Sequence, residues 1–308
     1  MNRPQISWLP DGRRLHLNHG PIDLIVETFG REAERGVAHQ AAIARFETIL
    51  GELVCELPEL RRPVGQTPRR FLGPTAGRME TAVQKFYPEF ITPMAAVAGS
   101  VADEMMAAMT KAADLDKAYV NDGGDVAIHL AAGQAITAAI AGTGHGFADQ
   151  LFIRAGDPVR GIATSGWRGR SFSLGIADAV TVLAGDAAAA DAAATMIANA
   201  VDLPGHPAIA RQPANELAPD TDLGARLVTT GVGALASADI SQALGRGAAI
   251  AESYRRRGLI QAAALFLAGE SAVTGQIGHP TSAAVSPHPP PACRPEGDGQ
   301  ARSGSLSR

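Results

Sequence analysis

Two side chains that carry oxygen ligands, Asp191 and Thr195, stand four residues apart in an alanine-rich segment of the chain. The segment lies between a strand-like run ending at Ala184 and Pro204, and its composition predicts a helix. Four-residue spacing places the carboxylate and the hydroxyl on one helical face, where they could hold a hard cation at two points. A packing helix that happens to carry both residues is the simpler interpretation, and spacing alone leaves both open.

A polar, glycine-rich segment lies upstream of this helix. It contains Thr164, Ser165 and Gly166, followed closely by Arg168 and Arg170. Hydroxyl groups, flexible backbone and two guanidinium groups within a few residues suit a phosphate or another anionic ligand. The alternative is a solvated turn that leads into the buried strand.

A second glycine-rich turn has the sequence Asn-Asp-Gly-Gly-Asp and begins at Asn121. Gly123 and Gly124 tolerate positive φ at its centre, so the pattern predicts a tight hairpin between two strands. Asp125 is less easily explained by turn chemistry, because it follows the glycines and opens a strand that should be buried. The turn is therefore either a simple hairpin or part of a ligand site.

Composition and charge limit the classes of function. The chain has 308 residues, 46% of them hydrophobic, and its formal net charge of −4 goes with scattered basic residues. Length and composition fit one large domain or two intimate ones. We expect no nucleic-acid partner, because a basic footprint is missing. We also expect no membrane span, because no window approaches ~18 uninterrupted apolar residues.

The cysteines and the first residues bear on the compartment. Cys55 and Cys293 are far apart in the sequence, which supports neither a disulfide framework nor a thiolate metal site. The first twenty residues contain charges and prolines but no continuous apolar stretch of the kind a secretory signal needs. We therefore expect a soluble cytoplasmic protein.

The order of the predicted elements favours an α+β fold, with helices layered on a largely antiparallel sheet. We expect a single domain over residues 1–270, made of two intimate subregions, and a disordered tail over 271–308, which is rich in Pro, Ser and Gly. The main predicted elements are strands at 15–19, 22–26, 126–130, 179–184 and 259–268, and helices at 31–57 (ending before Pro58), 93–113 and 238–256, with an irregular connection over 58–77.

Four segments carry a resemblance to a known group of proteins. They are TPMAAVAGSVADE from Thr92, YVNDGGDVAIHL from Tyr119, GIATSGWRGRSFSLGIADAVTVLA from Gly161 and ADAAATMIANAV from Ala190. Together they resemble an uncharacterised protein family within the ApbE-like superfamily, whose named members are FAD:protein FMN transferases. The resemblance to the uncharacterised family covers most of residues 1–270. The resemblance to the transferases rests on VNDGGD, ATSG and ADAAAT, in that order.

The resemblance implies a layered fold with a ligand cleft between the two subregions. It also implies that Asp191 and Thr195 bind Mg²⁺, with the backbone carbonyl of Ala98 completing the site. The cofactor is then FAD or FMN. The residues implied to bind it are Asn121, Gly123, Gly124, Asp125, Thr164, Ser165, Gly166 and Arg168.

This chain departs from the transferases at two places. Gly99 and Ser100 stand where the transferases carry a lysine, and the run from Ser173 to Asp178 replaces their HxxDPxTG segment and lacks its histidine. We therefore weigh two hypotheses. One is an Mg²⁺-dependent enzyme that cleaves a diphosphate or transfers a flavin or nucleotidyl group. The other is a non-catalytic protein that binds a flavin or a pterin. Under either hypothesis the partner is a small nucleotide-like ligand. The chain could also form a homodimer.

Overall fold

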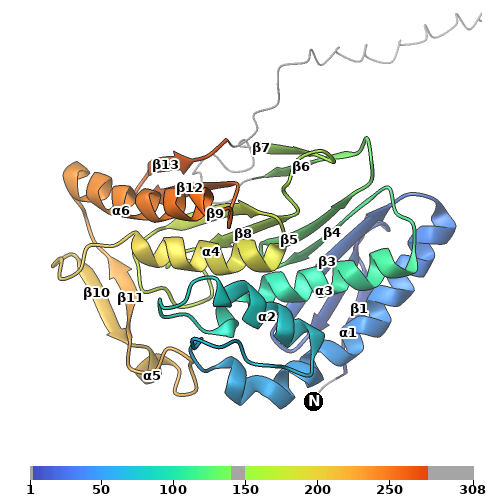
Figure 1. Ribbon diagram of the computed structural model, residues 1–308, viewed down its shortest axis with the longest axis horizontal. Coiled ribbons are helices and arrows are strands. Elements are labelled where there is room, and N and C mark those ends of the chain that lie inside the picture. Colours follow the sequence, from blue (N-terminus) through green and yellow to red (C-terminus); the bar gives the residue numbers. More distant parts are fainter. Residues whose placement is uncertain (1–2, 140–149, 277–308) are drawn as a thin grey trace, which may run out of the picture.

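A nine-stranded antiparallel sheet forms the centre of the protein, whose computed structural model describes residues 3–139 and 150–276 (Figure 1). All neighbouring strands in it pair antiparallel, which confirms the expected fold class. In spatial order the strands are β1 (Gln5–Trp8), β2 (Leu15–His19), β3 (Ile22–Phe29), β4 (Lys117–Asp122), β5 (Asp125–Leu130), β8 (Gly161–Ser165), β9 (Ala179–Ala184), β12 (Ala262–Leu267) and β13 (Glu270–Thr274).

Helices cover one face of this sheet (Figure 1). They are α1 (Glu32–Leu60), α2 (Pro74–Gln84), α3 (Val97–Ala112), α4 (Ala187–Ala200) and α6 (Ser237–Arg256), and the short 3-10 helix η1 (Pro93–Ala96) leads directly into α3. Two hairpins lie outside the sheet: β6 (Ala135–Ala139) with β7 (Gln150–Arg154), and β10 (Ile209–Pro213) with β11 (Leu227–Val232), joined through the one-turn helix α5 (Ala214–Leu217).

The central strands are buried on both faces. Val182 and Ala263 belong to the core under the helices, whereas their neighbours Leu183 and Ala262 pack with Ile153 of the β6–β7 hairpin. Successive side chains of a strand point to opposite faces, so these strands must be apolar throughout. This explains why β9 appears in the sequence as a continuous apolar run.

Helices α3 and α4 approach each other closely at their first turns. A Cβ on Gly99 would lie 2.2 Å from the carbonyl oxygen of Ala187, so only glycine permits the contact. Each helix also caps the other. Asp103 of α3 accepts hydrogen bonds from Ala187 N (3.1 Å) and Ala188 N (2.9 Å), and Asp191 of α4 accepts one from Gly99 N (3.0 Å). These bonds satisfy N–H groups that have no partner within their own helix.

Two predicted boundaries along the first third of the chain were wrong. Helix α1 continues through Pro58 to the buried Leu60, because a proline in the last turn removes only one terminal hydrogen bond while the core contact is kept. Helix α2 begins at Pro74, inside the stretch predicted to be irregular, with the proline at its first position.

A paired strand continues past residue 270, where the sequence predicted the domain to end. Strand β13 follows β12 through a two-residue turn in which Ala268 and Gly269 both have positive φ, and its backbone pairs with β12 as far as Thr274. Ladder hydrogen bonds do not require large apolar side chains, so composition gave no sign of this strand. The remainder of the predicted tail, 277–308, lies outside the described residues.

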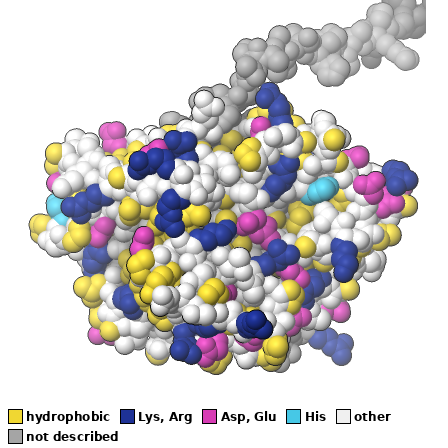
Figure 2. Space-filling model, in the orientation of Figure 1, with side chains coloured by type: hydrophobic (Ala, Val, Ile, Leu, Met, Phe, Trp, Pro, Cys, Tyr) yellow, Lys and Arg dark blue, Asp and Glu magenta, His cyan; other side chains and the backbone are white. Residues whose placement is uncertain are grey.

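Acidic and basic side chains are interspersed over the face of the molecule drawn in Figure 2. Among the residues that the structure describes, no helix combines the length and apolarity that a bilayer crossing requires. Cys55, the free cysteine of the described chain, is exposed on α1.

Replacing Gly99 by alanine should destabilise the protein, because the new methyl group forces α3 and α4 apart. We expect a loss of roughly 2 kcal/mol or more in the free energy of unfolding, within the range for overpacking of a tight contact. Gly36→Ala is the matched control, since Gly36 also lies in a helix but has no neighbouring atom within 4 Å of its would-be Cβ. The control should gain about 0.5–1 kcal/mol. Urea denaturation of both variants tests this, and equal stability of the two would contradict the close contact.

Candidate functional site

A cavity of about 560 Å³ opens where the start of α3, the β4–β5 turn, the end of β8 and one face of α4 meet. It gathers most of the residues predicted from the sequence to form the site. Those that line it are Ala98, Gly123, Asp125, Thr164, Ser165, Gly166, Asp191 and Thr195. Four segments of the chain therefore converge on one place.

Three predicted residues, Asn121, Gly124 and Arg168, do not line the cavity but shape its walls. The side-chain oxygen of Asn121 accepts a hydrogen bond from Gly124 N (2.8 Å) and closes the hairpin turn. Arg168 donates from Nε to Asp178 and lies over the ring of Trp167 at 4.9 Å. Of the two arginines in the predicted loop, Arg168 therefore stabilises the loop itself.

Asp191 lies half-buried at the cavity wall, and the first turn of α3 faces its carboxylate. Desolvation raises its pKa well above the ordinary value, and the negative charges of Asp125 and Asp122 raise it further. Hydrogen bonds from the backbone N–H groups of Gly99 and Ala98 act in the opposite direction. Ala98 is therefore adjacent to Asp191 and contacts it through its N–H group, whereas the resemblance implied a metal-binding role for its carbonyl.

Asp125 and Asp122 complete a group of neighbouring carboxylates. Burial raises the pKa of each to about 7; for Asp122 the nearby charge of Asp125 contributes as well. Asp125 also accepts a hydrogen bond from Thr164 N (3.1 Å), which ties the end of β8 to the start of β5 where the backbone ladder is short. The sheet therefore holds two members of the acidic group, Asp122 and Asp125, and α4 holds the third, Asp191.

The donor set can be compared with the needs of a metal ion. Within the described parts of the chain, no cluster of three or more His, Cys, Asp or Glu side chains has the arrangement to hold a metal unaided. Asp191 and Thr195 lie one helical turn apart on the cavity wall, with Asp125 and Asp122 nearby. Mg²⁺ suits such a sparse set, because it commonly takes one or two carboxylates and fills its remaining positions with water and substrate phosphate.

Sequence reasoning missed several residues of the cavity. Asp222 and Leu223 come from the loop before β11. A hydrogen bond from the Thr92 hydroxyl to Asp222 holds that loop beside η1. No local pattern marks this contact, whereas Asp122 stands inside the predicted turn and could have been included.

The two departures from the transferase pattern have structural explanations. Gly99 leaves no room for a side chain against Ala187, so a lysine there would separate α3 from α4. Ser173 is buried away from the cavity, and its hydroxyl contacts Asn199 Oδ1 (3.4 Å) and Gly175 N (3.2 Å). Ser173 therefore stabilises the chain locally and does not replace the missing histidine.

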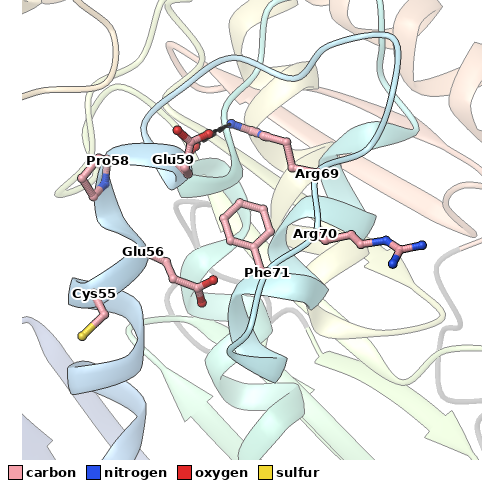
Figure 3. A pocket seen from close by; sticks show the side chains of 7 residues that line it. All are labelled: Cys55, Glu56, Pro58, Glu59, Arg69, Arg70 and Phe71. Atoms are coloured by element: carbon pink, nitrogen blue, oxygen red, sulfur yellow. Dashed lines mark hydrogen bonds and ion pairs between the residues drawn. The ribbon is translucent and has the colours of Figure 1, made fainter.

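A second cavity, of about 420 Å³, lies between the last turns of α1 and the segment before α2 (Figure 3). Arg69 donates to the carbonyl of Glu59 (2.5 Å) and pairs with the buried Glu80 (2.7 Å). In Figure 3, Phe71 lies between the two segments and Arg70 points away from them. None of the predicted site residues lines this cavity.

The raised pKa values predict how stability depends on pH in the metal-free protein. Asp122 and Asp125 have a pKa of about 7 in the folded chain against an ordinary value of 3.8, so folding takes up protons between these values. Their contribution is complete below about pH 4 and is lost as the pH rises through 7, by up to about 1.4 kcal/mol per pH unit for each group. Urea denaturation from about pH 5 to about pH 8 should show this decline, and Asp122→Asn should flatten it. Stability that rises over the same range in the parent would contradict the assignment.

Comparison with known proteins places these residues in a family. The family described as AbpE bacteria matches residues 6–273. UPF0280 proteins of Methanothrix thermoacetophila and Methanococcoides burtonii are similar to the chain. The first is 38% identical over 129 residues, which is 42% of this chain and 52% of that protein. The second is 37% identical over 125 residues, 38% of this chain and 48% of that protein. The chain thus spans about half the length of the curated relatives it matches.

The apo crystal structure of the flavinyl transferase ApbE from Pseudomonas stutzeri aligns with 89% of this chain and 95% of its own, at 13% identity and a TM-score of 0.43. The family match extends from β1 into β13 and so includes every segment that lines the cavity. On that match, the chain belongs to the AbpE bacteria family.

Proposed function

We propose that the cavity binds a flavin nucleotide, FAD or FMN, or a related phosphorylated heterocycle, together with Mg²⁺. The observation that carries the proposal is that Asp191 and Thr195 of α4 and Asp122 and Asp125 of the sheet line one cavity, with the three carboxylates close enough to interact. The flavin itself is suggested by the family and by the VNDGGD, ATSG and ADAAAT segments, which border this same cavity.

The acidic group supports the Mg²⁺ part of the proposal. Neighbouring carboxylates that raise one another's pKa favour a bound cation, because its charge offsets their repulsion and desolvation. Asp191 and Thr195 of α4 would bind the ion, and Asp125 or Asp122 would supply the remaining protein ligand. When bound, the ion supplies positive charge that neutralises a phosphate or diphosphate.

Other walls of the cavity suit the remainder of a flavin nucleotide. Gly166 lines the cavity with backbone alone. A side chain is excluded at this position, since a Cβ would lie 2.5 Å from the carbonyl oxygen of Asp178. Ser165 and Thr164 present polar groups next to it. Phe172 keeps 39% of its surface exposed at the cavity, which leaves an aromatic face for a flat ring to stack on.

Two kinds of activity fit this binding mode. The first is an enzyme that cleaves the FAD diphosphate or transfers a flavin or nucleotidyl group with the help of Mg²⁺. The second is a non-catalytic protein that holds a flavin or pterin. The described residues that form the lining include no histidine, lysine, cysteine or tyrosine, so proton transfer in the first kind of activity would fall to Asp122 or Asp125, whose pKa of about 7 suits a general acid or base.

Incubation of the purified protein with FAD and Mg²⁺ tests the function. We expect FAD to bind and to stay intact or to be cleaved slowly to FMN and AMP, with no flavin on a threonine of a partner protein. Calorimetry measures binding, chromatography measures cleavage, and in-gel flavin fluorescence detects transfer. A fluorescent acceptor band would make the protein a flavin transferase. A lack of affinity for both FAD and FMN would overturn the flavin assignment.

Asp191→Asn should weaken Mg²⁺ binding by an order of magnitude or more, because the swap keeps the shape but removes the charge that a hard cation needs. Asp103→Asn is the matched control, since Asp103 also caps a helix start but does not line this cavity. Both variants should fold, because asparagine is itself a good helix cap. Titration calorimetry with Mg²⁺ in the presence of FAD separates them. Equal Mg²⁺ affinity in the two variants would refute the metal assignment.

A further inference from the structure

Arg170 lies across the glycine turn between β4 and β5. A Cβ on Gly123 would be 2.1 Å from Nη2 of Arg170 and 3.3 Å from its Cζ, so the guanidinium rests directly on bare backbone. Gly123 has a φ of +64° and both residues line the cavity. The contact brings together the polar loop and the glycine turn, which are more than forty residues apart in sequence.

The two arginines of the polar loop have different situations. Arg168 is engaged by Asp178, whose carboxylate also binds Trp167 Nε1 (3.1 Å) and Ala268 N (2.7 Å). Within residues 3–139 and 150–276, Arg170 has no hydrogen bond or ion pair and is the one basic residue that lines the cavity. Its five N–H donors are therefore available to a ligand.

The surroundings of Arg170 determine what kind of ligand it can bind. Its charge lowers the pKa of Asp122 and Asp125, so it lies within electrostatic reach of the acidic group. A cation on that group and the guanidinium of Arg170 would then present positive charge to one volume. Phosphate oxygens match this pair, because arginine binds phosphate in a bidentate manner and a metal ion takes the remaining oxygens.

We propose that Arg170, held across Gly123, binds the phosphate of the nucleotide and makes the cavity selective for phosphorylated over unphosphorylated rings. This inference rests on the proposed function and adds a specificity-determining residue to it. Gly123 is required for this contact, because any larger residue would push the Arg170 guanidinium off the turn. Arg168, although it lies in the same loop, is bound to Asp178 and does not line the cavity.

Titration calorimetry with Mg²⁺ and four probes tests the inference: FAD, FMN, riboflavin and inorganic pyrophosphate. Arg170→Gln should lower the affinity for FAD, FMN and pyrophosphate by about ten- to a hundredfold, the range for a lost charge-assisted hydrogen bond. Riboflavin has no phosphate, so its affinity should not change. Arg256→Gln, at an exposed arginine of α6, controls for net charge and should leave all four affinities as in the parent.

Gly123→Ala provides an independent route to the same interaction. It should reduce FAD affinity in the parent but have little further effect when Arg170 is already glutamine, because both changes remove one contact. Full additivity of the two losses would contradict the coupling between the glycine and the arginine.

The outcomes separate this inference from the function on which it rests. If the parent binds FAD and Arg170→Gln binds it equally well, or loses riboflavin to the same degree, phosphate recognition by Arg170 is refuted and flavin binding stands. If the parent binds pyrophosphate through Arg170 but neither FAD nor FMN, the flavin assignment fails and the phosphate assignment stands. If the parent binds none of the probes, both fail.

Discussion

The reciprocal capping of α3 and α4 is the constraint on which the site depends. Asp103 of α3 binds the first N–H groups of α4, and Asp191 of α4 binds the first turn of α3. The exchange requires the two helix starts to meet, which Gly99 alone permits. Once they meet, Asp191 and Ala98 have no freedom to leave the cavity wall. The same contact excludes a side chain as long as lysine at position 99.

This architecture places negative charge where it is costly. Burial raises the pKa of Asp103 to about 6 and of Asp122 and Asp125 to about 7, and it also raises the pKa of Asp191 well above its ordinary value. Structural ion-pair networks can perturb pKa values too, but no ion pair with a basic residue within the described chain neutralises Asp122, Asp125 or Asp191. A bound cation would relieve the repulsion among them, so the fold and the proposed ligand are linked through the same carboxylates.

The sequence predicted the parts of the site that depend on local spacing. Asp191 and Thr195 share a helical face because of their four-residue spacing, wherever the helix packs. The tight turn containing Gly123 likewise depends only on its own sequence and on the two strands that it joins. What could not be predicted depends on contacts between distant segments. Arg168 and Arg170 look equivalent in the sequence, and only Asp178 distinguishes them by binding the first. Strand β13 was missed because pairing with β12, rather than side-chain burial, defines it.

The central claim is that α4 and the glycine turn together hold a divalent cation that receives phosphate. A crystal structure with Mn²⁺ and pyrophosphate, recorded at a wavelength where manganese scatters anomalously, tests it most directly. The account predicts an anomalous peak at bonding distance, about 2.0–2.3 Å, from a carboxylate oxygen of Asp191 and the hydroxyl of Thr195, with pyrophosphate oxygens completing the coordination. A cavity without such a peak, or a peak bound elsewhere while Asp191 only caps α3, would contradict it.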